Sequence, residues 1–336
     1  MSVWQAFDAP SAGYANLLSS AIEITQRKFN DLLWPVDEGL QVIVSDYSGQ
    51  HRQATYEVYS FLITTWGALQ DWLPLREAFR TQWLPDKRRI SFKQLREPVR
   101  RRAYPHFLEL AGALPANLLT VMIDNRVGSF IDGGPQALAA ALDDCFVPGA
   151  SPNGIEKIYR LALLVAMLQA GLRREKQRSL WVSDHDKTLD TFDKRERFSR
   201  LATYLTLGLT GRHKSAEQSF ITTETKNLPD WIEDLAAVPD IAAGACARLD
   251  NTLPLFMEQN TWTVGMVHGD NMDWRAKMFG DWLSLPHGVL RHVLVRLAPD
   301  ARGEIRASAQ KFMRRTLAQD HYQRPFGFNN QKDDPA

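Results

Sequence analysis

Three apolar segments of the sequence each end in an aspartate. VIVSD ends at Asp46, TVMID at Asp124 and LWVSD at Asp184. A carboxylate at the end of a buried strand costs little where water reaches it and much where apolar neighbours enclose it. Several carboxylates that meet at one place repel one another unless a cation neutralises them. The repeated pattern therefore suggests strands that deliver acids to a cation site.

A fourth acid belongs to a helix. The segment PDIAAGACARL, from Pro239 to Leu249, places Asp240 in the first turn of a predicted helix, where the helix dipole favours a negative charge. The residues that follow are almost all alanine and glycine, which would let this helix approach a sheet closely. Oxygen ligands of this kind suit Mg²⁺ or Mn²⁺. A pair of such ions would activate a water molecule for attack on a phosphodiester.

The order of these motifs resembles the RNase H-like superfamily, specifically a bacterial family of unassigned function. That family has an Asp-Glu-Ser-Gly first motif and an Ala-Asp-x-x-Ala-Gly motif in its last helix. Here the first motif reads DYSG, from Asp46 to Gly49, and the last reads PDIAAGA, from Pro239 to Ala245. ISFKQL (Ile90 to Leu95), TVMIDN and LWVSD lie between them in the family's order. The resemblance covers about Leu40 to Leu249.

The resemblance implies a metal-dependent nuclease with Asp46, Asp184 and Asp240 as catalytic ligands of Mg²⁺ or Mn²⁺. Asp186 is the alternative to Asp184, because a shift of two residues keeps the same face of a strand. Tyr47 stands where the family has glutamate, so an eroded site remains the alternative to an active one. Asp124 is expected to be a structural acid on a neighbouring strand.

Basic residues provide candidates for binding the substrate. Those predicted to contact nucleic acid, together with the Ser48 hydroxyl, are Lys87, Arg88, Arg89 and Lys93 in the run from Lys87 to Arg102, and Lys226 by the resemblance. A solvated helix face is the commoner reason for a basic run. The formal net charge of the chain is only +1, so any attraction to nucleic acid must be local.

Several enzyme classes are set aside because the sequence lacks their motifs. VHGDN, from Val267 to Asn271, is similar to the catalytic loop of small-molecule kinases, but the position that would need a metal-binding asparagine is Arg275. The sequence has no zinc-ligand spacing, no HExxH, no Walker loop, no GxGxxG after a strand and no GxSxG. Metalloproteases, P-loop ATPases, dehydrogenases and α/β-hydrolases are therefore set aside.

The predicted architecture is α/β, an RNase H-like mixed sheet flanked by helices. Residues 39–250 are expected to form this domain, with a helical N-terminal extension at 1–38 and a helical C-terminal extension at 251–336 packed on it. Cys145 and Cys246 have apolar or small neighbours and are expected to be free thiols of a cytoplasmic protein. No apolar run reaches the length of a membrane span.

Apolar periodicity predicts the individual elements. The strands are expected at Leu40–Ser45, Ala54–Thr65, Arg89–Phe92, Leu118–Ile123 and Ser179–Ser183. The helices are expected at Ala15–Leu33, Trp66–Arg80, Lys93–Gly112, from Gly154 onward, at Arg195–Gly208, as two short pieces of Pro229–Leu249 broken around Pro239, and at Glu304–Ala318. The function expected is phosphodiester hydrolysis by two metal ions, in bacterial defence or a mobile element. The alternative is an eroded scaffold or nucleic-acid-binding subunit with a protein partner in a larger complex.

Overall fold

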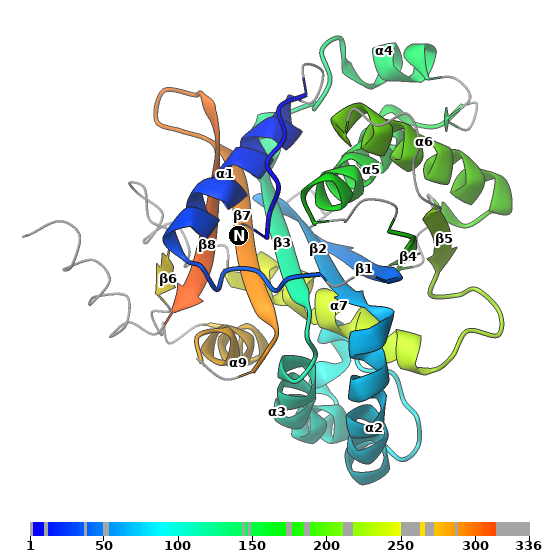
Figure 1. The fold of residues 1–336 in the computed structure, drawn as a ribbon, viewed down its shortest axis with the longest axis vertical. Helices are drawn as coiled ribbons and strands as arrows, with labels where there is room; N and C mark the ends of the chain where they lie inside the picture. The colour runs from blue at the N-terminus through cyan, green and yellow to red at the C-terminus, as the bar shows by residue number, and fades with distance from the viewer. Residues whose placement is uncertain are drawn as a thin grey trace, which may run out of the picture.

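The computed structural model describes most of the chain. The described residues are 3–9, 13–36, 39–49, 54–142, 145–146, 149–172, 177–184, 189–210, 218–249, 263–265, 272–285 and 288–313. Within them, helices cover both faces of one mixed sheet (Figure 1). The α/β class and the sheet flanked by helices are therefore as predicted.

Eight strands of the described chain make up the sheet. They are β1 (Gln41–Ser48), β2 (Tyr56–Thr65), β3 (Asn117–Asp124), β4 (Ser179–Ser183), β5 (Gln218–Thr222), β6 (Thr263–Gly265), β7 (Arg291–Pro299) and β8 (Ile305–Met313). Their order is β5-β4-β1-β2-β3-β7-β8-β6. The pairs β1–β2 and β2–β3 are antiparallel, whereas β4 is parallel to β1 and β5 to β4. On the other side, β7 is parallel to β3 and antiparallel to β8, and β6 is parallel to β8.

The helices divide between the two faces of the sheet. They are α1 (Tyr14–Lys28), α2 (Trp66–Trp83), α3 (Pro98–Gly112), α4 (Gly134–Ala141), α5 (Pro152–Leu172), α6 (Phe192–Thr210), α7 (Trp231–Leu249) and α9 (Trp274–Leu283). Short 3-10 helices, η1 (Phe92–Arg96) and η2 (Asn125–Val127), complete the described elements. One face carries α1, α4, α5 and α6, and the other carries α2, α3, α7 and α9 (Figure 1). No described helix combines the length and the apolar character that a membrane crossing needs.

Strand β1 is central, and its side chains alternate between two cores. Ile43 packs with the α1, α5 and α6 side, whereas Val42 and Val44 pack with the α2, α3 and α7 side. Burial on both faces explains why the segment is a continuous apolar run. Alternation continues along the strand, so Asp46 shares the α7 face with Val44, and Tyr47 lies on the opposite face.

The C-terminal part of the sequence was misread. In the described part of the helix expected at Glu304–Ala318, residues Ile305–Met313 form the strand β8, which pairs with β7, and neither strand was predicted. Ile305, Ala307 and Ala309 pack on the α1 side, and this period of two is the strand pattern that was missed. The C-terminal extension is therefore not wholly helical, because it also lengthens the sheet.

Two expectations near the candidate site were also wrong. The segment Arg89–Phe92 is not a strand but leads into η1, and a separate helix, α3, begins at Pro98. Glu97 ends the first piece and caps the second by accepting hydrogen bonds from two α3 amides. Pro239 does not break α7, which is a single helix with the proline in its interior.

Candidate active site

Asp46 and Asp184 are brought side by side by neighbouring parallel strands. In the β1–β4 register Ser45 lies opposite Ser183, and the Asp184 amide donates a hydrogen bond to the Ser45 carbonyl at 3.0 Å. Val44 and Val182 both pack against α7. Because side chains alternate along a strand, the acids two residues later reach the same α7 face. Two acids far apart in the sequence thus meet at one edge of the sheet.

Asp240 comes from the middle of α7, not from its first turn. The helix begins nine residues earlier, at Trp231, so the dipole of the helix start does not explain the position of this acid. Its Oδ2 accepts a hydrogen bond from the Phe92 amide at 2.5 Å. Helix α7 packs directly on β1 and β2, which brings the carboxyl group to Asp46.

The small residues of α7 matter most at Gly244, one turn after Asp240. A Cβ atom there would lie 2.4 Å from Cγ of Phe92, too close for any side chain. The expected close approach is therefore to the Phe92 ring as well as to the sheet. Arg275, on α9, holds the same residue by donating a hydrogen bond to the Phe92 carbonyl at 2.9 Å and by lying over its ring.

The pKa values of Asp46 and Asp240 are raised because both carboxyl groups lie close to other acids and away from water. Asp46 is only 6% exposed. Burial, the charges of Asp240 and Asp184 and a hydrogen bond shared with Asp240 raise the pKa of Asp46 well above its ordinary value. Burial also raises the pKa of Asp240, although the Phe92 amide and Arg89 act in the opposite direction. These raised pKa values favour a proton shared by the two carboxyl groups.

Asp184 is the better neutralised member of the group. Arg89 Nη2 and the Thr223 hydroxyl each donate a hydrogen bond to Asp184 Oδ1, both at 3.1 Å. Thr223 follows β5, the strand parallel to β4, and its amide donates to the Ser183 carbonyl. Arg89 Nε is buried and has no hydrogen-bond partner among the described residues.

All three acids line one cavity of about 660 Å³. Its other charged or hydroxyl-bearing lining residues include Ser48, Tyr56, Arg89, Lys93 and Arg248. Of the predicted substrate-binding residues, Ser48, Arg89 and Lys93 line the same cavity as the acids. The structure brings together, from separate parts of the chain, the acids and part of the predicted basic set.

The remaining predicted binding residues are not among those that line this cavity. Lys87 is exposed, and Arg88 forms ion pairs with Asp86 and Glu97. Lys226 is exposed in the turn between β5 and α7. Asp186, the alternative ligand, lies outside the described residues, as do His268 and Asp270 of the VHGDN motif.

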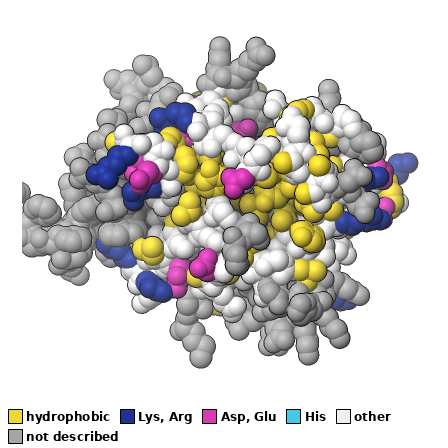
Figure 2. Space-filling model, turned by 90° about the horizontal axis from the view of Figure 1, so that it is seen from above, with side chains coloured by type: hydrophobic (Ala, Val, Ile, Leu, Met, Phe, Trp, Pro, Cys, Tyr) yellow, Lys and Arg dark blue, Asp and Glu magenta, His cyan; other side chains and the backbone are white. Residues whose placement is uncertain are grey.

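The molecular face in Figure 2 shows how the described lysine and arginine side chains are distributed over the surface. On the face of the molecule in Figure 2, the described lysine and arginine side chains lie mainly towards the two sides of the view. Apolar side chains occupy its centre, with separate acidic side chains among them. This face agrees with the near-zero net charge, because its described part carries no continuous basic surface.

The side chains of Tyr47 and Asp124 do not point towards the three acids. The Tyr47 hydroxyl shares a hydrogen bond with Ser183 Oγ on the α5 side of the sheet, where its ring packs on Tyr59. The tyrosine in place of the family's glutamate is thus built into the opposite core. Asp124 is buried at the end of β3 and bonded to Arg126, which agrees with a structural role.

Sequence reasoning missed several contributors to the site. Thr223 and Arg248 carry no motif, although each has a positional signal: Thr223 follows the strand next to β4, and Arg248 lies two turns after Asp240 on α7. The Phe92 amide had no signal in the sequence, because any residue type supplies a backbone N–H.

The donor set fits a divalent cation. Its side-chain ligands are carboxylate oxygens from the buried Asp46, the half-buried Asp240 and Asp184, and the raised pKa values of the first two favour protonation that a cation could replace. As the side chains stand, the described residues include no group of three or more His, Cys, Asp or Glu arranged to hold an ion.

The fold and site define an α/β protein with a buried cluster of strand-end and helix acids. A comparison with protein-family models finds no match, and a comparison with curated proteins finds none.

Proposed function

We propose that this protein is a Mg²⁺- or Mn²⁺-dependent nuclease of RNase H-like architecture. The observation that carries the proposal is the meeting of Asp46, Asp184 and Asp240 in one cavity although they are far apart in the sequence. Burial and the charges of the neighbouring acids raise the pKa of Asp46 and of Asp240, which favours their protonated forms. Such a cluster is costly for folding and is therefore better explained by chemistry than by stability.

The order of the strands supports the RNase H-like part of the proposal. An antiparallel meander of β1, β2 and β3 is followed by β4 and β5, which are parallel to β1 and lie on its other side. This gives the acids of β1 and β4 adjacent positions at one end of the sheet. The last helix of the motif series, α7, then supplies the third acid across the face.

Each residue of the site has a defined part in the proposed reaction. Asp46, Asp240 and Asp184 would hold the ions, which when bound would lower the pKa of a water molecule and neutralise charge on a phosphate. Arg89 donates a hydrogen bond to Asp184, and its guanidinium group lines the same cavity, where it would add positive charge for a phosphate. Thr223 keeps the Asp184 carboxylate oriented.

The substrate class follows from the rest of the cavity wall. Lys93 and Arg248 are exposed cations at the cavity, and Ser48 and Tyr56 add hydroxyl groups. Cations beside a phosphodiester cleft bind a nucleic-acid backbone without reading its sequence. We propose nucleic acid as the substrate, and by the resemblance a role in bacterial defence or a mobile element.

The test is a cleavage assay with labelled single- and double-stranded DNA and RNA. The wild-type protein is expected to cleave at least one of them with Mn²⁺ and none with EDTA. Asp46→Asn and Asp240→Asn each remove charge from the centre and are expected to lower the rate at least about a hundredfold. Asp124→Asn is the matched strand-end control, and it should keep the activity because this acid is paired with Arg126 away from the cavity.

A second candidate is a nucleic-acid-binding scaffold with an eroded site. Tyr47 favours it, because the side chain at the family's glutamate position points into the opposite core and offers no ligand to the cavity. Binding of the four nucleic acids that is insensitive to EDTA, with no cleavage by the wild type, would support the scaffold. Cleavage that Asp46→Asn abolishes would exclude it.

A further inference from the structure

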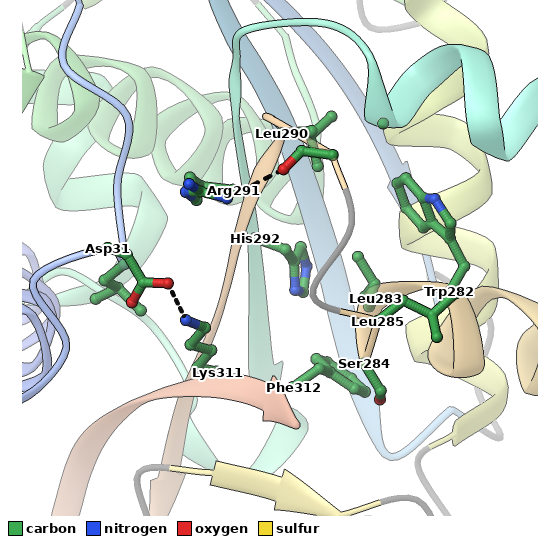
Figure 3. A pocket seen from close by; sticks show the side chains of 13 residues that line it. Asp31, Trp282, Leu283, Ser284, Leu285, Leu290, Arg291, His292, Lys311 and Phe312 are labelled. Atoms are coloured by element: carbon green, nitrogen blue, oxygen red, sulfur yellow. Dashed lines mark hydrogen bonds and ion pairs between the residues drawn. The ribbon is translucent and has the colours of Figure 1, made fainter. Parts of the chain in front are cut away.

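A second cavity lies between α9, β7 and β8 (Figure 3). Its volume is about 240 Å³, and it shares no lining residue with the acidic cavity. Its walls come from four separate parts of the chain: the segment after α1, the end of α3, the end of α9 and the strands β7 and β8. This cavity plays no part in the proposed hydrolysis.

His292, on β7, is the polar centre of this cavity. Its side chain is 8% exposed, and Nε2 shares a hydrogen bond of 3.1 Å with the Thr120 hydroxyl. The other ring nitrogen, Nδ1, is buried without a hydrogen-bond partner among the described residues. Figure 3 shows the imidazole among Leu283, Lys311 and Phe312, inside the space that these side chains enclose. A buried nitrogen left unpartnered costs stability, so the position is better explained by a bound group that completes it.

The protonation state of His292 limits what that group is. Burial lowers the pKa of His292 to about 3, so the imidazole is neutral at physiological pH. A neutral imidazole offers Nδ1 as one donor or one acceptor. It therefore suits an uncharged polar atom such as a hydroxyl, and it does not provide the counter-charge for an anion.

The charge lies at the mouth of the cavity. Lys311 and Asp31 form an ion pair of 2.6 Å, and Arg291 lines the cavity beside them. Burial would raise the pKa of Asp31, but the hydrogen bond from Lys311 and the charges of Lys311 and Arg291 hold it below its ordinary value. Among the described residues that line the cavity, two cations and one carboxylate leave a net charge of +1, and Arg291 has no carboxylate partner there, although it donates a hydrogen bond to the Gly288 carbonyl.

The walls set the size and polarity of the ligand. Leu283, Leu290 and Phe312 supply apolar surface, and Trp282 closes one side near Gly112. An engineered apolar cavity of about 150 Å³ is known to hold benzene, so this larger space admits one ring with substituents. The wall thus combines apolar side chains with several polar and charged ones, and converging polar groups are what orient a ligand in a small-molecule site.

We propose that this cavity binds a small organic monoanion: a single apolar ring that carries a carboxylate towards Arg291 and a hydroxyl towards His292 Nδ1. The carboxylate meets the unbalanced positive charge at the mouth. The ring fills the space against Leu283 and Phe312. The hydroxyl satisfies the buried imidazole nitrogen. The proposal does not depend on the nuclease activity.

The test is calorimetric titration of the full-length protein with matched ring compounds. The probes are 4-hydroxybenzoate, benzoate without the hydroxyl, and 4-hydroxybenzamide without the charge, with further hydroxylated ring carboxylates and their amides to vary the ring substituents. At least one hydroxylated carboxylate is expected to bind with one-to-one stoichiometry. Loss of the charge or of the hydroxyl is expected to weaken binding about tenfold or more, because a hydrogen bond to a charged group or to a buried atom is lost.

Variants locate the binding. Arg291→Gln, at a half-exposed position, is expected to weaken the carboxylates about tenfold and leave the amides unchanged. His292→Phe, which fills the cavity, should abolish binding, and circular dichroism checks that both variants fold. Asp46→Asn, in the other cavity, should bind as the wild type does. No saturable binding by any hydroxylated carboxylate, or equal binding by Arg291→Gln, would overturn the proposal.

Discussion

Helix α7 carries two buried or half-buried aspartates, six residues apart, in opposite electrostatic situations. Asp234 is fully buried, and it accepts hydrogen bonds from Arg76 at 2.6 Å and from Arg80, both on α2. Asp240 faces Asp46, and burial together with the charges of the neighbouring acids raises the pKa of both. The same residue type on the same helix is thus neutralised by two cations at one position and set against another acid at the other.

The difference teaches which acid builds the protein and which acid is left for chemistry. Asp234 ties α7 to α2, and Arg80 also donates a hydrogen bond to the carbonyl of Arg88, next to Arg89. The paired acid therefore fixes the helix and the segment that borders the cavity. The position of Asp240 therefore costs stability locally, and the ion pairs of Asp234 hold the helix that carries it. The predictions below separate these two roles.

The largest effect on stability is expected from the paired acid. Asp234→Ala would remove the buried carboxylate that Arg76 and Arg80 share, at a cost of about 3–5 kcal/mol in the free energy of unfolding. Urea denaturation followed by circular dichroism measures it. The control is Asp230→Ala, whose carboxylate is half exposed and lies 3.2 Å from Arg76. A loss below about 1 kcal/mol for Asp234→Ala would mean that α7 is held by packing alone.

A smaller loss of stability, with loss of activity, is expected where α7 meets Phe92. Gly244→Ala adds a Cβ that collides with the Phe92 ring, and overpacking of this kind costs about 1–3 kcal/mol. Because the Phe92 amide holds Asp240, cleavage should fall as well.

Gly208→Ala is the matched control for this substitution. Gly208 is also a helical glycine, but its added Cβ meets nothing within 4 Å. It should gain about 0.5–1 kcal/mol and keep its activity, because alanine is the better helix former. Equal effects of the two substitutions would show that Gly244 is not needed for close packing.

The unpaired acid predicts an unusual dependence of stability on pH. Burial and the charges of Asp240 and Asp184 raise the pKa of Asp46 in the folded protein, whereas the unfolded value is about 3.9. The folded state then binds more protons, so the free energy of unfolding falls as pH rises above about 4 and levels off beyond the folded pKa.

Asp46→Asn removes this titration. The variant should match the wild type near pH 4 and become increasingly more stable than it towards neutral pH, in urea melts at a series of pH values. Asp234→Asn is the control, and it should not become more stable than the wild type towards neutral pH, because this acid is paired with Arg76 and Arg80. A wild type that stays as stable as Asp46→Asn at every pH would contradict the shared proton.

The smallest effect is expected at Thr223. Thr223→Val removes the hydroxyl that donates to Asp184 and should cost about 0.5–1.5 kcal/mol. Cleavage should fall severalfold, because among the described residues the Asp184 side chain would then keep only the hydrogen bond from Arg89. Thr210→Val, which loses a hydroxyl bond within α6, is the control for stability without a change in activity. Equal cleavage by the two variants would remove Thr223 from the site.

The parts of the fold that the sequence predicted are those with strong local patterns. The runs that became β1, β3 and β4 are buried on both faces, and a continuous apolar run between turns records that burial directly. The helices α2, α5 and α6 follow helical periodicity. By contrast, β8 alternates small and polar residues, so its period of two was hidden, and β7 was missed although HVLVRLA is rich in β-branched and apolar residues.

The sequence predicted the acids of the candidate site, but not the residues that hold these acids in place. Asp46 and Asp184 could be placed because each ends an apolar strand. Asp240 was placed in the right cavity for a wrong reason, since α7 continues through Pro239 and the acid lies in its middle. The partners of Asp234 are more than 150 residues away in sequence, so no local pattern reveals which acid of α7 is neutralised.

The most direct measurement is calorimetric titration of the protein with Mn²⁺ at pH 7 in buffers of different ionisation enthalpy. If the acids of the cavity form a cation site, the wild type binds Mn²⁺ saturably and releases on the order of one proton per ion, because the cation replaces the proton shared by Asp46 and Asp240. Asp46→Asn should show neither the saturable binding of Mn²⁺ nor the release of a proton. Wild-type and Asp46→Asn titrations that are the same, or a wild type that shows no saturable binding, would contradict the account.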